Sequence, residues 1–386
     1  MIERAVVVGA GLIGTSIALA LRERGVEVAL ADRDPATVRL ACELGAGVPL
    51  EEGKDERPAD IAVVAAPPAV IPALLRDVQS RGLARFYTDV ASVKQAVVTE
   101  AVRLGCDLTT FVPSHPMGGS ERNGPSAARA DLFLGRSWAL CPTGKATPEA
   151  VAAVAELARS CGADPLEIDA QEHDRAVALV SHAPHVASSA VAARLVEGGG
   201  AALALAGQGV RDVTRVAGGD PGLWLEILSH NPGPVAEVLA GIAADLDAVA
   251  RALRSGRTAE ATVLDLLERG RDGHARIPGK HGAGRTPGYA VLPVVIPDEP
   301  GALGRLFAAA GTAGVNIEDI RIDHSPGLPV GVAQLSVLPE RVATLARALA
   351  DQGWSVHPDR LDRPSREESA LLSGPDHTAP PANLGR

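Results

Sequence analysis

A glycine pattern near the start of the chain has the residue types and spacing of a phosphate-binding turn. Gly9, Gly11 and Gly14 form G-x-G-x-x-G directly after the apolar run 5–8 and before a helical stretch at 15–24. The first glycine permits a tight turn, the second lets a pyrophosphate approach the backbone, and the third lets the helix pack against the strand. We expect this turn, with Leu12 and Ile13 between the glycines, to bind a dinucleotide at the helix N-terminus.

An acidic residue indicates which dinucleotide binds. Asp32 follows the second expected strand, at 26–30, and lies 18 residues after Gly14. A carboxylate there can accept hydrogen bonds from ribose hydroxyls and would repel a 2′-phosphate, so the sequence predicts NAD as the cofactor rather than NADP. Arg33 could pair with such a phosphate and soften the preference.

Four histidines lie in polar segments that proline and glycine interrupt, namely His115, His173, His182 and His185. His115 is the first candidate for a proton acceptor, because the Pro and Gly residues that follow it hold the backbone at a cleft edge without side-chain bulk, and imidazole titrates near neutrality. Taken alone, each histidine is more often a structural residue. His173 beside Asp174 is interpreted as structural, and His182 with His185 lacks a third ligand, so we expect no metal.

Several segments in a fixed order resemble the prephenate/arogenate dehydrogenase family. They are 89–94 (DVASVK), 115–119 (HPMGG) with Glu121, 173–174, 181–185 (SHAPH), 211–215 (RDVTR) and 218–221 (GGDP) ahead of Trp224. With the glycine pattern they extend the resemblance over nearly all of residues 1–270. Gly118 and Ala183 depart from the residues common in the family, but neither change removes a functional group.

The resemblance implies hydride transfer from the C4 hydroxyl carbon of a cyclohexadienol to NAD, followed by loss of the ring carboxylate. His115 would accept the hydroxyl proton and Ser92 would orient that hydroxyl. Arg215 would hold a substrate carboxylate, assisted by His185 and by Arg211. Glu121 would lie near the pocket mouth.

Three alternative functions can be compared with the sequence. Arogenate could replace prephenate as the substrate, since the two differ only in an amino or a keto group on the side chain. A non-catalytic sensor of NAD and an amino acid would be expected to lack His115 or Arg215, which are both present. A β-hydroxy acid dehydrogenase would need a lysine in its helical domain, and residues 169–270 contain none.

The elements that must position these residues fall into three domains. Strand-like runs at 5–8, 26–30, 61–64 and 86–89 alternate with helical stretches, which predicts an α/β Rossmann-type domain over residues 1–168. Residues 169–270 have Ala, Leu and Val at helical spacing, for example at 235–253, and are expected to form an all-helical substrate and dimerisation domain of a homodimer. A Gly-, Arg- and Pro-rich linker is expected at 271–287, and a disordered tail at 359–386.

Residues 288–358 are expected to form a small α+β domain in the order β-α-β-β-α-β, with strands at 289–297, 317–323, 330–338 and 354–356 and helices at 301–311 and 341–351. The segment DEPGAL at 298–303 and GVNI at 314–317 resemble an ACT domain. That resemblance implies an amino-acid effector such as tyrosine, with Asp298, Gly301, Asn316 and Ile317 as the regulatory residues.

Composition excludes several classes of partner. The chain of 386 residues carries 37 Lys and Arg against 47 Asp and Glu, a formal charge of −10, and has no long basic run, so nucleic acid is not an expected partner. The uncharged run at 61–75 is too short for a bilayer and contains three prolines. Four widely spaced cysteines and the absence of a signal-peptide pattern indicate a cytoplasmic protein in a reducing compartment.

Overall fold

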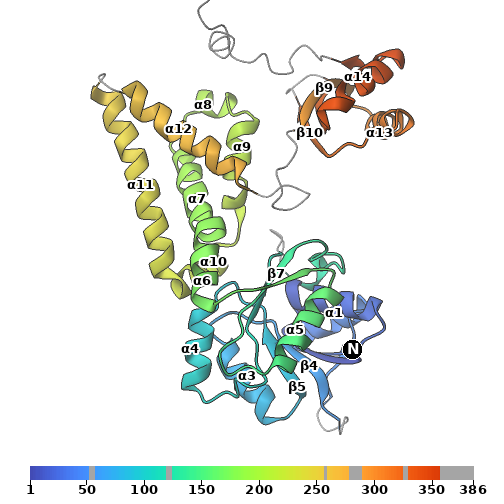
Figure 1. Ribbon diagram of the computed structural model, residues 1–386, viewed down its shortest axis with the longest axis vertical. Helices are drawn as coiled ribbons and strands as arrows, with labels where there is room; N and C mark the ends of the chain where they lie inside the picture. Colours follow the sequence, from blue (N-terminus) through green and yellow to red (C-terminus); the bar gives the residue numbers. More distant parts are fainter. Residues whose placement is uncertain (52–56, 119–123, 256–258, 278–288, 325–328, 357–386) are drawn as a thin grey trace, which may run out of the picture. The chain divides into compact units, whose positions relative to one another are not determined.

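The computed structural model describes residues 1–51, 57–118, 124–255, 259–277, 289–324 and 329–356. The chain divides into two compact units, Met1–Thr262 and Val263–Arg386, and each is described by itself. The first unit contains the Rossmann-type domain and most of the helical domain, and the second contains the small α+β domain (Figure 1).

The first domain is built on a parallel sheet in the order β3-β2-β1-β4-β5. Its strands are β1 (Arg4–Val8), β2 (Glu27–Ala31), β3 (Val48–Pro49), β4 (Ala59–Val64) and β5 (Ala84–Asp89). The order reverses between β1 and β4, and ligands of open α/β sheets bind outside the carboxyl ends of the strands at such a point. The Rossmann-type prediction is therefore confirmed, and each of its four expected strands is present within two residues of its expected bounds.

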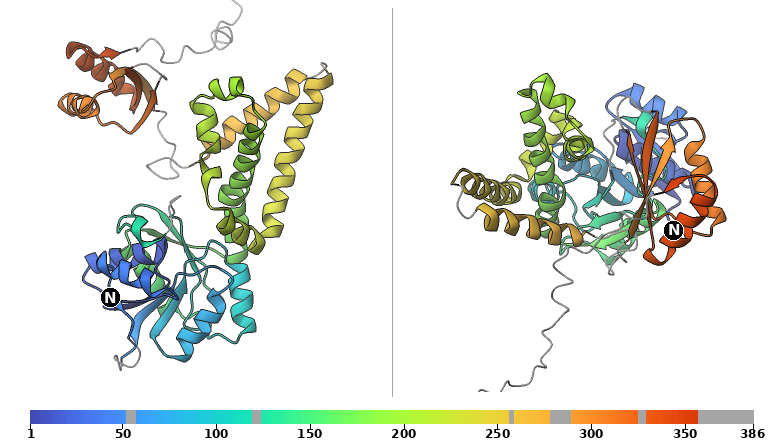
Figure 2. Two further views of the ribbon diagram at one scale, coloured as in Figure 1. Left: turned by 180° about the vertical axis from the view of Figure 1, so that it is seen from behind. Right: turned by 90° about the horizontal axis from the view of Figure 1, so that it is seen from above.

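Helices cover both faces of this sheet (Figure 2). One face packs against α1 (Leu12–Glu23), α2 (Pro35–Glu43) and α5 (Pro148–Ser160), whose side chains share a core with Val7 and Ile61. The other face packs against α3 (Ile71–Ser80) and α4 (Gln95–Arg103), which share a core with Val6 and Ala62. Alternate residues of each strand thus enter opposite cores, as the period of two along a strand requires.

A second, three-stranded sheet was not predicted from the sequence. It consists of β6 (Ser114–Pro116), antiparallel to β7 (Ser137–Leu140), which pairs in parallel with β8 (Asp164–Glu167). β6 has only three residues and ends in proline, so its periodicity is too short to be recognised. This strand carries His115.

The helical domain begins with one continuous helical run of α6 (Ala170–Val177), the π-helix η2 (Ala178–His182) and α7 (Ala183–Val196). Pro184, the second residue of α7, has no N–H to donate, and the π-helix ends two residues before it. By length and composition alone, the run Ala170–Val196 could cross a membrane. Its buried Asp174, however, hydrogen-bonds the first domain, which favours a core helix of a globular protein.

The rest of this domain is also helical where the structure describes it. It contains α8 (Gly200–Ala204), α9 (Gln208–Thr214), η3 (Arg215–Gly218), α10 (Pro221–His230), α11 (Pro232–Ser255) and α12 (Ala259–Ala275). α12 continues beyond 270, so the first five residues of the expected linker are helical, while 278–288 lie outside the described residues.

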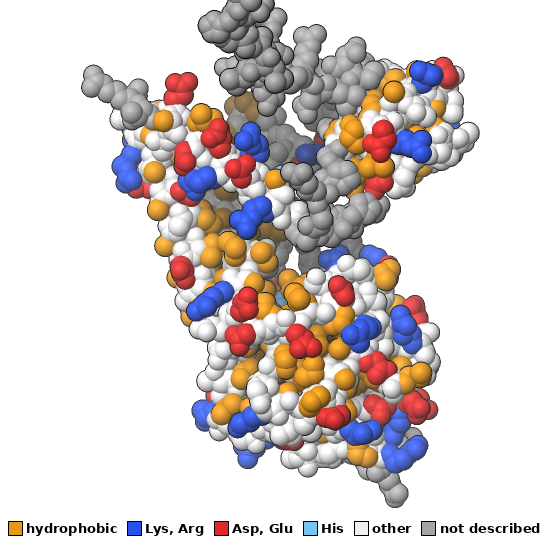
Figure 3. Space-filling model, viewed as in Figure 1, with side chains coloured by type: hydrophobic (Ala, Val, Ile, Leu, Met, Phe, Trp, Pro, Cys, Tyr) orange, Lys and Arg blue, Asp and Glu red, His pale blue; other side chains and the backbone are white. Residues whose placement is uncertain are grey.

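Large apolar side chains of the helices face solvent (Figure 3). Leu205 is 87% exposed, Val196 is 86% exposed and Leu225 is 69% exposed. No side chain of α8 or α9 is buried in the single chain. Exposed apolar surface on this scale is typical of a protein interface.

The second unit contains a four-stranded sheet in the order β10-β11-β9-β12. Its elements are β9 (Ala290–Pro297), α13 (Ala302–Thr312), β10 (Asp319–His324), β11 (Val330–Val337), η4 (Pro339–Arg341), α14 (Val342–Asp351) and β12 (Ser355–Val356). The expected β-α-β-β-α-β order is confirmed. The predicted disordered tail lies outside the described residues.

Candidate functional site

The glycine turn has the geometry that a dinucleotide requires. Gly9 has φ +105°, and a Cβ there would lie 2.0 Å from the carbonyl oxygen of Ala65. A Cβ on Gly14 would lie 1.9 Å from the Gly9 oxygen, whereas one on Gly11 would meet nothing within 4 Å. Gly9 and Gly14 are therefore needed for close packing of the backbone, and Gly11 leaves open space at the first turn of α1.

The end of β2 supplies a carboxylate beside this turn. The Ala10 N–H donates to Asp32 Oδ2 at 2.8 Å, and the Asp34 N–H donates to Asp32 Oδ1 at 3.0 Å. Helix α1 begins after Gly11 without a side-chain cap, so its first N–H groups are available to an anion. Arg33 is exposed. These features fit a pyrophosphate at α1 and a ribose at Asp32.

A cleft of about 590 Å³ connects the glycine turn to the helical domain. From the first domain it is lined by Gly11, Leu12, Ile13, Gly14, residues 65–68, Val90, Ala91, Ser92, residues 115–118 and Gly124. From the helical domain it is lined by Ser181, His182, Leu223, Trp224 and Ile227. The structure thus places His115 and Ser92, predicted from the sequence, in the same cleft as the glycine turn.

His115 belongs to a chain of three hydrogen-bonded side chains. Its Nδ1 lies 3.0 Å from His173 Nε2, and His173 Nδ1 lies 2.9 Å from Asp174 Oδ1. The two imidazoles meet edge to face with ring centroids 5.2 Å apart. Burial lowers the pKa of His115 well below its usual value, and the nearby His173, Lys94 and His182 lower it further. The imidazole is therefore neutral at pH 7, which a proton acceptor must be.

His182 is the second imidazole at the cleft. The side-chain nitrogen of Asn231 donates to the Asp174 carbonyl oxygen at 2.7 Å and lies 3.2 Å from His182 Nδ1. Since that nitrogen is a donor, His182 Nδ1 accepts and Nε2 carries the proton. Burial lowers the pKa of His182 to about 4, so the ring is a neutral N–H donor at pH 7.

A buried polar network supports the strand that carries His115. Lys94 and Asp89 form an ion pair with both side chains fully buried, and Lys94 Nζ also donates to the Ser114 carbonyl oxygen at 2.6 Å. Trp138 Nε1 donates to Ser114 Oγ at 2.9 Å. The backbone immediately before His115 is therefore fixed by charged and polar contacts from two sheets.

The predicted substrate-binding residues do not line this cleft. His185 stacks on Trp224 with ring centroids 3.6 Å apart, and a side chain on Gly219 would collide with that pair. Arg211 on α9 and Arg215 at the start of η3 are exposed. Their roles remain predictions, as does that of Glu121, which lies outside the described residues.

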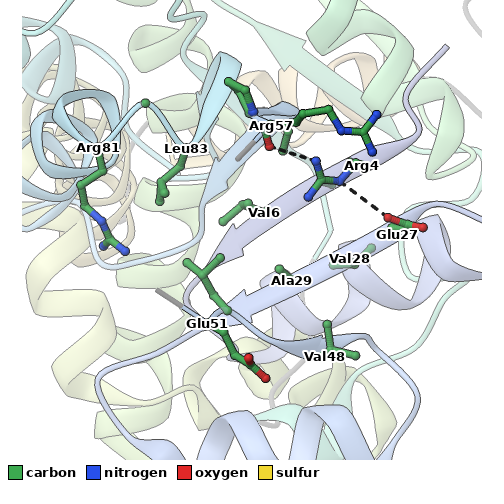
Figure 4. A pocket seen from close by; sticks show the side chains of 15 residues that line it. Arg4, Val6, Glu27, Val28, Ala29, Val48, Glu51, Arg57, Arg81 and Leu83 are labelled. Atoms are coloured by element: carbon green, nitrogen blue, oxygen red, sulfur yellow. Dashed lines mark hydrogen bonds and ion pairs between the residues drawn. The ribbon is translucent and has the colours of Figure 1, made fainter. Parts of the chain in front are cut away.

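Other cavities lie away from this chemistry. One of about 640 Å³ covers β1 and β2 and includes Arg4, Arg57 and Arg81, on the sheet face that also carries α3 (Figure 4). In the second unit, Asn316 and Ile317 line a groove of about 480 Å³, whereas Asp298 and Gly301 do not. Within the described residues, no group of three His, Cys, Asp or Glu side chains could hold a metal ion.

Sequence reasoning missed three residues at the site. His173 is predicted to be structural, Asn231 has no predicted role, and His182 is one of the four candidate histidines but has no predicted role of its own once a metal pair with His185 is set aside. The separation of 58 residues between His115 and His173 hides their contact. The adjacent His173-Asp174 pair was a signal that could have indicated an oriented imidazole.

Comparison with known proteins yields matches to two family models. Residues 17–166 match the model described as prephenate dehydrogenase, nucleotide-binding domain, and residues 169–267 match prephenate dehydrogenase, dimerization domain. The probable prephenate dehydrogenase NovF of Streptomyces niveus is 39% identical over 92% of this chain and 99% of its own length. Prephenate dehydrogenase of Bacillus subtilis is 29% identical over 81% of this chain and 86% of its own.

Solved structures are similar over the same region. A putative prephenate dehydrogenase from Corynebacterium glutamicum is 28% identical, with a TM-score of 0.65 over 72% of this chain and 91% of its own. Synechocystis arogenate dehydrogenase is 29% identical, with a TM-score of 0.58 over 70% and 99%. Aquifex aeolicus prephenate dehydrogenase in complex with hydroxyphenyl propionate and NAD+ shares the fold at 24% identity, with a TM-score of 0.63 over 72% and 99%.

Proposed function

Because the chain belongs to the prephenate dehydrogenase family, we propose that the cleft beside His115 oxidises prephenate with NAD and releases its ring carboxylate as carbon dioxide. The product is 4-hydroxyphenylpyruvate, a precursor of tyrosine. One observation carries the proposal: the dinucleotide turn, Ser92 and His115 line a single cleft. The enzyme is thus an NAD-dependent oxidoreductase.

His115 supplies the base for this reaction. Its Nε2 takes the proton of the C4 hydroxyl, the C4–H bond breaks, and its electron pair leaves as hydride. The bond between the ring and its carboxylate then breaks, and those electrons complete the aromatic ring. Ser92 shares the cleft with His115 and orients the hydroxyl. Aromatisation makes the sequence of steps effectively irreversible.

The dinucleotide is held by Gly9, Gly11, Gly14 and Asp32, with Leu12 and Ile13 beside its pyrophosphate. Bound NAD provides the acceptor for the hydride. The Asp32 carboxylate accepts from ribose hydroxyls and disfavours a 2′-phosphate, while exposed Arg33 modulates that preference. Pyrophosphate binding at the uncapped start of α1 places the cofactor at the same end of the sheet as His115.

Substrate carboxylates bind to Arg215, with His185 and Arg211 assisting and Glu121 at the mouth of the cleft. Prephenate carries two negative charges, and arginine binds carboxylates through two parallel hydrogen bonds. The match to the dimerization-domain model and the exposed apolar side chains of the helices support a homodimer. We assign the enzyme to the cytoplasm and expect neither nucleic acid nor a membrane as a partner.

The βαββαβ unit is proposed to sense an amino acid such as tyrosine, as an ACT domain does. Asn316 and Ile317 line a groove there, while Gly301 has φ +84° at the turn before α13, close to Asp298. A groove beside a strand start can bind a small ligand through backbone groups. Tyrosine binding to residues 289–356, measured by calorimetry on the full chain and abolished by Asn316→Ala, would support this assignment.

A kinetic assay tests the proposed function. Purified protein is incubated with prephenate or arogenate and with NAD or NADP, and formation of reduced dinucleotide is followed by absorbance. We expect turnover with prephenate and NAD, and a loss of at least about a hundredfold in kcat for His115→Asn with NAD affinity unchanged. Full activity of His115→Asn would refute the role of His115. Turnover with arogenate but not with prephenate would identify arogenate as the substrate instead.

A further inference from the structure

We propose that His173 and Asp174 are positioning residues, which hold His115 in the one tautomer that can accept the substrate proton. The inference rests on the proposed role of His115 as the base. It extends the site into the helical domain, because α6 carries both residues whereas β6 carries His115.

The tautomer follows from the order of donors and acceptors along the chain of side chains. Asp174 is an acceptor, so His173 Nδ1 must carry the proton that binds it. A His173 ring whose single proton is on Nδ1 offers a lone pair at Nε2. His115 Nδ1 must donate to that lone pair, which leaves His115 Nε2 without a proton. Since the ring lines the cleft, Nε2 is the nitrogen available to the substrate.

Asp174 is itself fixed against the first domain. Its carboxylate accepts from the Lys94 N–H at 2.8 Å and from the Gln95 N–H at 2.9 Å, at the start of α4. Its backbone carbonyl accepts from Asn231. His173 is 2% exposed and Asp174 is 3% exposed, so neither side chain can turn toward solvent. The acceptor presented to His115 therefore has a single orientation.

Charge also favours this arrangement once the base has taken up a proton. The groups facing His115 are Lys94 and the rings of His173 and His182. Lys94 is paired with Asp89, which leaves Asp174 as the carboxylate aligned with the imidazolium through His173. An anion placed behind an imidazole in this way orients the ring and stabilises its protonated form.

Kinetics on two variants of His173 test the inference. His173→Phe keeps a ring but removes the acceptor, and kcat should fall at least about tenfold, while the KM for prephenate and the affinity for NAD change less than about threefold. In His173→Gln the side-chain oxygen can replace Nε2 as the acceptor, so kcat should recover toward wild type. His274→Gln, on exposed α12, is the matched control and should keep full activity. Equal kcat in wild type, His173→Phe and His173→Gln would overturn the inference.

Nitrogen-15 NMR of histidine-labelled wild-type protein gives a second test, in which no variant of His173 is needed. With the His115 signals assigned by their absence in His115→Asn, the inference requires a protonated Nδ1 and an unprotonated Nε2 at pH 7. A protonated Nε2 would overturn it. The two claims can fail separately. The tautomer is observed without substrate and tests only the inference, whereas failure of the wild-type protein to oxidise prephenate would refute only the proposed function.

Discussion

Replacing Lys94 with methionine should destabilise the first domain strongly. The lysine and its partner Asp89 are both fully buried, and the Asp89 carboxylate also accepts from the N–H groups of Ala91 and Ser114. Methionine has nearly the same length and volume as the lysine side chain without its charge. Lys94→Met therefore removes the counter-charge and leaves a buried carboxylate with backbone donors alone.

The magnitude follows from the cost of an uncompensated buried charge. Removing one partner of a buried ion pair costs about 3–5 kcal/mol of the free energy of unfolding, of the order of half the stability of a typical domain. The substitution also removes the 2.6 Å hydrogen bond from Lys94 Nζ to the Ser114 carbonyl, worth about 1 kcal/mol or more. Lys94→Met with Asp89→Asn should recover most of the loss, because the paired charges disappear together.

Urea unfolding followed by circular dichroism, with tryptophan fluorescence as a second probe, measures these differences. Lys145→Met is the control, because Lys145 is an exposed lysine of the same domain. It should change the free energy of unfolding by less than about 0.5 kcal/mol. A loss below about 1 kcal/mol in Lys94→Met, or a double variant no more stable than Lys94→Met, would show that Lys94 does not stabilise the buried Asp89 carboxylate.

Three further predictions concern the cofactor, acid stability and the substrate. Asp32→Ala should weaken NAD about tenfold or more, since a charged hydrogen bond is worth about 1.5–3 kcal/mol, and fluorescence titration should show NADP much less affected. The pKa of His182 is lowered from 6.5 to about 4, so the unfolded chain takes up a proton first as pH falls, and stability declines between pH 6.5 and 4. Urea unfolding at pH 7 and at pH 4 gives the decline in the free energy of unfolding between the two pH values. His182→Gln should make this decline smaller by about 3 kcal/mol. An unchanged decline would contradict the prediction. Arg215→Ala should raise the prephenate KM with little change in kcat, and an unchanged KM would remove Arg215 from the site.

The fold was predictable where a pattern spans many residues. The Rossmann-type sheet, the helical run at 235–253 and the β-α-β-β-α-β order follow from periodicity and glycine placement, and the structure has all three. The β6-β7-β8 sheet was not predictable, because a strand of three residues has no measurable period. α12 also extends past the expected domain end, since charged residues on an exposed helix resemble a linker in composition.

The site was predictable only in part, for a related reason. Gly9, Gly11 and Gly14 act within six residues, so their steric roles can be derived locally and agree with the geometry. His115 and Ser92 reach the same cleft through different elements. The Pro and Gly residues after His115 make it a candidate, whereas the role of Ser92 comes from the resemblance to a family. The contact between His115 and His173 depends on how α6 packs against β6, which no local pattern encodes.

A single residue, Asp174, determines which ring nitrogen carries the proton in both imidazoles at the cleft. Its carboxylate reaches His115 through His173, and its carbonyl reaches His182 through Asn231. The first path leaves an acceptor nitrogen on His115, and the second leaves an N–H donor on His182. Burying four polar side chains would be costly without these mutual hydrogen bonds, so the network also requires that the two domains pack in a single way. The hydrogen bonds that orient His115 are therefore complete only when the helical domain packs against the first domain, so the proposed active site depends on side chains of both domains.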